Sequence, residues 1–137
     1  MSAADKLAII DAIDAYLALA DDPAVTAVAG MFMPDAVWEC YAEGARQPSL
    51  RFASLAALES ALAQARNGPR LRHHRTGLRF DHLAAGTART TVKVLVTEQD
   101  GDAAPPRLAN VACEIGTWRK TAFGWKVASW TVYREIL

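Results

Sequence analysis

The stretch TARTTVKVLVTEQDGDAAPPRLANVACEIGTWR, residues 87–119, contains two long β-prone runs joined by a loop. In the first run Val92, Val94 and Val96 fall on one face, because side chains of an extended chain alternate between its two sides. The loop, QDGDAAPP, is built of glycine, aspartate and proline, which favour turns. Two such runs around a short loop predict an antiparallel hairpin.

Further β-prone runs extend this hairpin on both sides. Residues 71–82 and 125–135 are rich in β-branched and aromatic side chains, and the turn sequences AAG and TAFG separate them from the central pair. Four consecutive strands with short connections predict an antiparallel meander. We therefore expect residues 71–135 to form one sheet.

The first half of the chain has helical periodicity instead. Apolar side chains recur every three or four residues between Asp5 and Ala20, and residues 23–32 and 55–66 are two further helical segments. Residues 36–41, AVWECY, are β-prone. We expect one α+β domain over residues 1–137, with three N-terminal helices packed on a strongly bent antiparallel sheet, cone-shaped around a pocket.

Composition narrows the set of partners. There are 15 basic and 15 acidic side chains, and this balance does not favour nucleic acid or an anionic membrane as a partner. The N-terminus has no signal-peptide pattern and no apolar run is long enough to cross a bilayer, so we expect a soluble cytoplasmic protein. Cys40 and Cys113 lack metal-site spacing, which predicts reduced core thiols. We expect no metal and no cofactor.

Two motifs carry a family resemblance. Residues 32–38 read Phe-x-x-Asp-Ala-x-Trp, and a Gly124–Trp125 hairpin stands near the end of the chain. With the order of helices and strands, they resemble the nuclear-transport-factor-2-like superfamily, in particular its SnoaL-like, polyketide-cyclase branch. The resemblance implies a cystatin-like roll, often a homodimer. Because this fold hosts enzymes and binding modules alike, function rests on the site.

The resemblance extends to individual residues of the ketosteroid isomerases. Tyr16 stands where those enzymes have an oxyanion-hole tyrosine, and Glu114 where they keep a protonated carboxylic acid that donates a hydrogen bond. Cys40 replaces their aspartate base, which argues against steroid isomerisation by that mechanism. Tyr16 is either an oxyanion donor or a core tyrosine, and Glu114 either faces a cavity or is a polar rim residue.

Asp21 and His73 form the second resemblance. Scytalone dehydratases and the hexachlorocyclohexane dehydrochlorinase pair an aspartate after the first helix with a histidine that opens a strand, and Asp21 and His73 occupy those places. A carboxylate on one imidazole nitrogen fixes the tautomer and leaves the other nitrogen as a general base. The alternative is that Asp21 caps a helix together with Asp22 and that His73 is an edge residue. The dehydratases' substrate-contacting tyrosine is replaced here by Ala20, and the dehydrochlorinase's arginine by Trp130.

The segment RLRHHRTGLRF, residues 70–80, leaves the choice of histidine open. Regular alternation would place His74, and not His73, on the same apolar face of the strand as Leu78. A β-bulge at Gly77 would reverse the alternation and turn His73 inward, so we predict an irregularity near Gly77. Five arginines lie close to the histidines in the sequence: Arg66, Arg70, Arg72, Arg75 and Arg79. They are either solvated surface charges or a binding site for an anion.

The sequence thus predicts a small lyase or isomerase of dehydratase or cyclase type, acting on an apolar or aromatic molecule. In this interpretation Asp21, His73 and Tyr16 are catalytic. Five residues are predicted to bind the substrate: Phe32, Trp38, Glu114, Trp118 and Trp130. The rival interpretation is a binding module or the small subunit of an aromatic-ring-hydroxylating dioxygenase.

Overall fold

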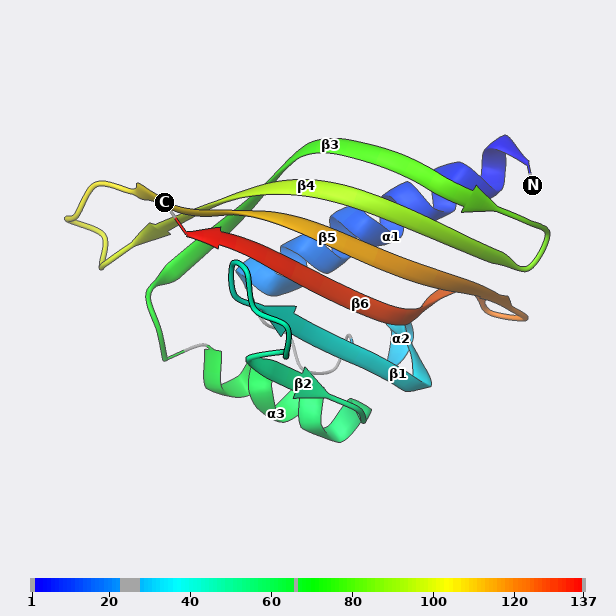
Figure 1. Ribbon diagram of the computed structural model, residues 1–137, viewed down its shortest axis with the longest axis horizontal. Helices are drawn as coiled ribbons and strands as arrows, with labels where there is room; N and C mark the ends of the chain where they lie inside the picture. Colours follow the sequence, from blue (N-terminus) through cyan, green and yellow to red (C-terminus); the bar gives the residue numbers. More distant parts are fainter. Residues whose placement is uncertain (1, 23–27, 66, 137) are drawn as a thin grey trace.

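The computed structural model describes residues 2–22, 28–65 and 67–136 (Figure 1). Three helices lie in the first half of the chain: α1 (Ala3–Asp21), α2 (Val28–Met31) and α3 (Leu55–Ala65). Six strands complete the fold: β1 (Phe32–Tyr41), β2 (Leu50–Phe52), β3 (Arg70–Leu83), β4 (Thr87–Gln99), β5 (Arg107–Thr121) and β6 (Gly124–Ile136). The α+β class is as predicted.

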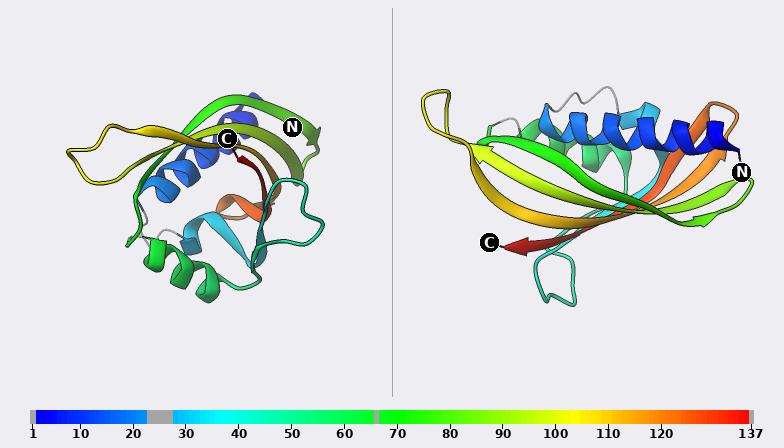
Figure 2. Two further views of the ribbon diagram at one scale, coloured as in Figure 1. Left: turned by 60° about the vertical axis from the view of Figure 1, so that its left-hand side comes forward. Right: turned by 90° about the horizontal axis from the view of Figure 1, so that it is seen from above.

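The strands form one sheet in the order β2-β1-β6-β5-β4-β3. Strands β3 to β6 are the predicted antiparallel meander. The prediction of an entirely antiparallel sheet is wrong, because β1 pairs in parallel with β6. The short strand β2, which pairs with β1, was not predicted. Figure 2 shows the long strands of this mixed sheet curving past α1.

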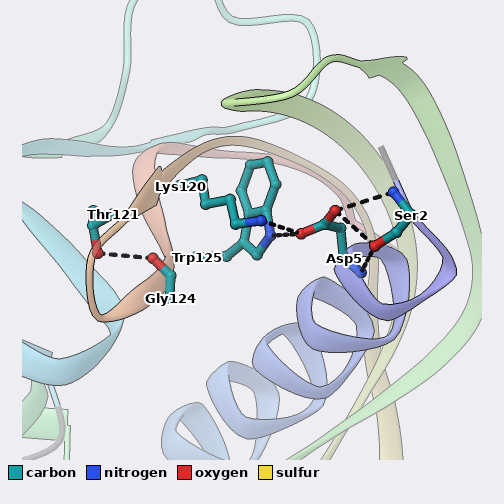
Figure 3. Close-up of polar contacts among 6 residues, drawn as sticks. All are labelled: Ser2, Asp5, Lys120, Thr121, Gly124 and Trp125. Carbon is teal, nitrogen blue, oxygen red and sulfur yellow. Dashed lines mark hydrogen bonds and ion pairs between the residues drawn. The ribbon is translucent and has the colours of Figure 1, made fainter.

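Helix α1 packs its apolar stripe against the concave face of the sheet. Ile13 and Leu17 are buried there, as the three- and four-residue spacing predicts, whereas the buried residue of the preceding turn is Ile9, and Leu7, expected in the same stripe, is exposed. Ser2 and Asp5 form a capping box at the N-terminus of the helix. The Asp5 carboxylate also accepts hydrogen bonds from Lys120 and Trp125, each at 2.9 Å (Figure 3). The first turn of α1 is therefore fixed to the β5–β6 hairpin.

The second predicted helix differs from the structure in its extent. Of the helix expected over residues 23–32, residues 23–27 lie outside the described residues, and α2 covers only Val28–Met31. Phe32 begins β1 rather than ending a helix. Helix α3 covers Leu55–Ala65 of the predicted range 55–66, and Arg66 lies outside the described residues. Ser54 caps this helix by accepting the Ala57 N–H at 3.1 Å.

Two tryptophans fill the centre of the core. Trp118 and Trp130 meet edge to face at 6.1 Å, and both are fully buried. Gly116 lies between them, where a Cβ atom would come within 2.6 Å of the Trp130 ring. Cys40 and Cys113 are free thiols, with Cys40 buried and Cys113 half-buried. In the described part of the chain, no helix has the length and apolar character needed to cross a membrane.

Candidate functional site

A cavity of about 230 Å³ opens between the concave face of the sheet, α1 and α3. Its walls are mostly aliphatic and aromatic, which suits an apolar ligand. Five of the eight predicted site residues line this cavity: Tyr16, Phe32, Trp38, His73 and Glu114.

Asp21 and His73 meet at the edge of the cavity. Asp21 is the last residue of α1 and His73 lies near the start of β3. One Asp21 carboxylate oxygen accepts two hydrogen bonds at 2.7 Å, from the backbone N–H and from Nδ1 of His73. Because an ionised carboxylate only accepts, Nδ1 carries the proton and Nε2 is left as the basic nitrogen. The side chains are 15% (His73) and 21% (Asp21) exposed, so the pair is largely shielded from solvent.

The predicted irregularity in β3 is confirmed. The register between β3 and β4 shifts between Arg75 and Gly77, so Thr76 is the extra residue of a bulge. Before the bulge His73 faces inward, and after it Leu78 does so as well. His74 is exposed on the other face. Because of the bulge, His73 and Leu78 both face inward although they are an odd number of residues apart.

Tyr16 lies on the buried face of α1 beside Trp130, with ring centroids 4.4 Å apart. Its hydroxyl oxygen accepts the Trp38 indole N–H at 2.9 Å. Within residues 2–22, 28–65 and 67–136, no acceptor is found for the hydroxyl proton. Burial raises the pKa of Tyr16 well above its usual value, and the Glu114 charge adds to this effect. The phenol therefore stays protonated and can donate a hydrogen bond.

Glu114 points inward from β5 and is 3% exposed. One of its carboxyl oxygens accepts the Trp130 indole N–H at 2.8 Å. Burial raises the pKa of Glu114, whereas this hydrogen bond and the neighbouring His73 and Arg134 side chains oppose the rise. Glu114 is therefore a cavity residue and not a rim residue.

Trp118 and Trp130 do not line the cavity, contrary to their predicted role in substrate binding. They lie deeper, in the core between the sheet and α1. Their indole nitrogens are satisfied by the protein, Trp118 by Thr90 at 2.9 Å and Trp130 by Glu114. Alternation placed both on the correct face of the sheet but could not say how far along that face the cavity extends.

The four arginines of the cluster that lie in the described ranges contribute no side chain to the cavity. Arg70, Arg75 and Arg79 pair with nearby aspartates on the surface. Arg72 is exposed and donates to a backbone oxygen, and Arg66 lies outside the described residues. Solvated surface charge is thus the interpretation that the structure supports. The described ranges contain no group of three His, Cys, Asp or Glu side chains arranged for a metal ion.

The lining residues that the sequence analysis did not identify include two with polar side chains. Asn110 of β5 and Arg134 of β6 both line the cavity. The Oδ1 atom of Asn110 is covered and has no hydrogen-bond partner. Alternation from Glu114 along β5, and from Trp130 along β6, leads to these two positions. The signal was therefore present, although polar residues in strands are more often solvent-facing.

Comparison with known proteins identifies the fold. The family model for the SnoaL-like domain matches residues 1–131. None of the curated proteins compared with the chain matches it.

Solved structures with the same fold agree with the family match. A protein assigned as the beta subunit of an aromatic-ring-hydroxylating dioxygenase from Novosphingobium aromaticivorans DSM 12444 has a TM-score of 0.82 at 17% identity, covering 98% of this chain and 90% of that one. A protein assigned as a scytalone dehydratase from the same organism has a TM-score of 0.79 at 16% identity, covering 97% and 85%. A protein of unknown function with a cystatin-like fold, from Nostoc punctiforme PCC 73102, has a TM-score of 0.81 at 14% identity, covering 98% and 94%. These identities establish a shared fold only.

Proposed function

The chain belongs to the SnoaL-like domain family, and we propose that it is a small lyase or isomerase of dehydratase or cyclase type. Its substrate is an apolar or aromatic small molecule bound in the cavity. The single observation that carries this proposal is the 2.7 Å hydrogen bond between His73 Nδ1 and the Asp21 carboxylate, with the imidazole ring on the cavity wall.

His73 acts as the general base. Nε2 takes a proton from a carbon of the substrate, and the electron pair of the broken C–H bond moves into a new double bond. In a dehydration the neighbouring hydroxyl group leaves and takes the proton from the imidazolium, which forms water and restores the base. Asp21 orients the ring and stabilises the imidazolium. A positioned base of this kind contributes about 10²- to 10⁴-fold in rate.

Tyr16 supplies the second element of the mechanism. Proton abstraction beside a carbonyl places negative charge on the carbonyl oxygen, and a preorganised donor stabilises that charge. The Tyr16 hydroxyl is such a donor, because Trp38 holds its oxygen and its proton has no acceptor among the described residues. Base and donor are side chains of this chain, so the step as written uses no further group.

Exchange of an acidic C–H proton tests the base without knowledge of the natural substrate. The probe is 2-tetralone, a two-ring ketone with exchangeable protons beside its carbonyl, followed by NMR in D₂O. We expect the protein to accelerate exchange above the buffer rate, and His73→Gln and Asp21→Asn each to lower the protein-dependent rate by about 10²-fold or more. His74→Gln is the matched control, because His74 lies on the opposite face. Undiminished exchange with His73→Gln would falsify the proposal.

A second candidate function is a non-catalytic subunit or binding module. It is favoured by the likeness to the protein assigned as a dioxygenase beta subunit. It is also favoured by exposed aromatic surface on the outer face of the sheet, where Tyr41 and Tyr133 stack at 5.1 Å. If the wild-type protein does not accelerate exchange of 2-tetralone, this second function takes precedence.

A further inference from the structure

Two side chains that line the cavity carry hydrogen-bond donors, and neither donates to an acceptor within residues 2–22, 28–65 and 67–136. Arg134 lies opposite Ala112 on the inner faces of β6 and β5, and Asn110 is the next inward residue along β5. The two are therefore diagonal neighbours on adjacent strands, a spacing that a long side chain bridges. Both belong to the wall of the same cavity.

Arg134 brings a permanent positive charge to this wall. In the described part of the chain, no carboxylate lies within ion-pair distance of its guanidinium. Of the two carboxyl groups beside the cavity, Asp21 is paired with His73, and Glu114 accepts the Trp130 indole N–H. The side chain is solvent-exposed, which places its charge at the rim of the cavity, where an anion can reach it.

Asn110 supplies a second donor. Asn110 lines the cavity and its covered Oδ1 atom has no hydrogen-bond partner among the described residues, so the amide is not held by a protein contact and its Nδ2–H is available to a ligand. Asn110 also pairs across the sheet with Val96, which in turn pairs with His73. Two strand spacings therefore separate Asn110 from the base, roughly 10 Å. A ligand about two fused rings wide spans that separation.

We infer that Arg134 and Asn110 bind a carboxylate group of the substrate, which makes the substrate an apolar or aromatic carboxylic acid. A carboxylate only accepts hydrogen bonds, which complements a guanidinium and an amide N–H, and arginine binds carboxylates with two parallel hydrogen bonds. A cationic ligand is disfavoured by the Arg134 charge. The inference rests on the proposed function for the idea that the cavity holds a substrate, and it adds the substrate's chemical class.

The cavity volume sets the size of the ligand. An apolar protein cavity of roughly 150 Å³ accommodates benzene. The cavity here, at about 230 Å³, is larger and suits one or two fused rings. The probes are therefore 2-naphthoate and its neutral amide, 2-naphthamide, which have the same rings and nearly the same shape.

Calorimetric titration of both probes at pH 7.5 tests the inference. We expect 2-naphthoate to bind at least about tenfold more tightly than 2-naphthamide, because a hydrogen bond to a charged group contributes about 1.4 kcal/mol or more, a tenfold change in affinity. Arg134→Met should abolish this preference, and Asn110→Leu should reduce it. Arg119→Met is the matched control, because Arg119 is an exposed arginine that does not line the cavity.

Three results would overturn the inference: no binding of 2-naphthoate at millimolar concentration, equal affinities for the two probes, or a preference that survives Arg134→Met. The comparison of the two probes with the wild-type protein needs no variant, so it holds even if a variant fails to fold. 2-Tetralone has no carboxylate, so its His73-dependent exchange in the wild-type protein tests the base separately from the carboxylate site. Equal affinities of the wild-type protein for the two probes, with this exchange intact, reject the carboxylate site alone, and a preference for 2-naphthoate without such exchange rejects the base alone.

Discussion

Glu114 is a buried carboxyl group whose protonation is coupled to folding. Burial raises its pKa above the ordinary value of 4.5. The folded state therefore keeps a proton that the unfolded state releases in the interval between the two pKa values. Its contribution to stability is fully present below pH 4.5 and is lost as the pH rises through the folded-state pKa.

Glu114→Gln should remove this dependence. Glutamine keeps an oxygen acceptor for the Trp130 indole N–H but cannot ionise, so we expect the variant to be stabilised relative to the wild type at pH 8, by on the order of 1 kcal/mol. The measurement is the free energy of unfolding in urea at several pH values between 4 and 8. A difference between the two proteins that stays constant over this range would show that Glu114 does not titrate with folding.

At the level of single residues, the sequence predicted the dyad but not the whole cavity. Asp21 and His73 were identified by their places in a resembling family, and the structure puts them in contact. Asn110 and Arg134 had no such guide, because alternation tells which face a residue occupies and not whether its polar atoms find partners. Whether a donor is satisfied depends on side chains from other strands, which one sequence does not specify.

The bulge in β3 is the structural element on which the orientation of His73 depends. His73 and Leu78 are five positions apart, so a regular strand would place them on opposite faces, and the extra residue Thr76 brings both inward. A regular strand that kept all of its residues would turn either the base or the apolar end of the strand toward solvent.

Deletion of Thr76 should therefore give a regular ladder in which His73 and Leu78 both stay inward, because their separation becomes that of Val96 and Val92 on β4. We expect this variant to keep the His73-dependent exchange of 2-tetralone. Deletion of Arg79 is the contrast, since Arg79 lies in a regular part of the same strand and its loss turns Phe80 away from the core, which should lower the free energy of unfolding by roughly 1.5–3 kcal/mol. Loss of exchange on deletion of Thr76 would contradict the assigned role of the bulge.

The helices and strands that depend on a local sequence pattern were the ones that could be predicted. The four strands of the meander, α1 and α3 follow from periodicity and capping residues such as Ser54. The parallel pairing of β1 with β6 joins segments about ninety residues apart, and the three-residue β2 exists only because β1 offers an edge. Neither has a local signature, because each depends on the complete sheet.

The whole molecule has two unlike faces. The helices and the cavity occupy the concave face of the sheet, and the outer face carries half-buried apolar side chains such as Val111, Cys113 and Ile115. Tyr133 lies on this outer face with 45% of its surface exposed, stacked on Tyr41. Exposed apolar surface is typical of interaction sites, so this outer face is where we expect a second copy of the chain to bind.

We expect the protein to be a dimer in solution, with a mass near twice 14.8 kDa by light scattering coupled to size-exclusion chromatography. Tyr133→Arg should shift it to the monomer, because two copies of the new charge would approach each other across a two-fold axis without a partner. Phe123→Arg is the control, since Phe123 is 92% exposed in the turn between β5 and β6. A monomeric wild-type protein, or a Tyr133→Arg variant that remains dimeric, would place the interface elsewhere. A monomeric wild type that still exchanges 2-tetralone would also show that each cavity works alone, as expected for a site whose base, donor and walls come from one chain.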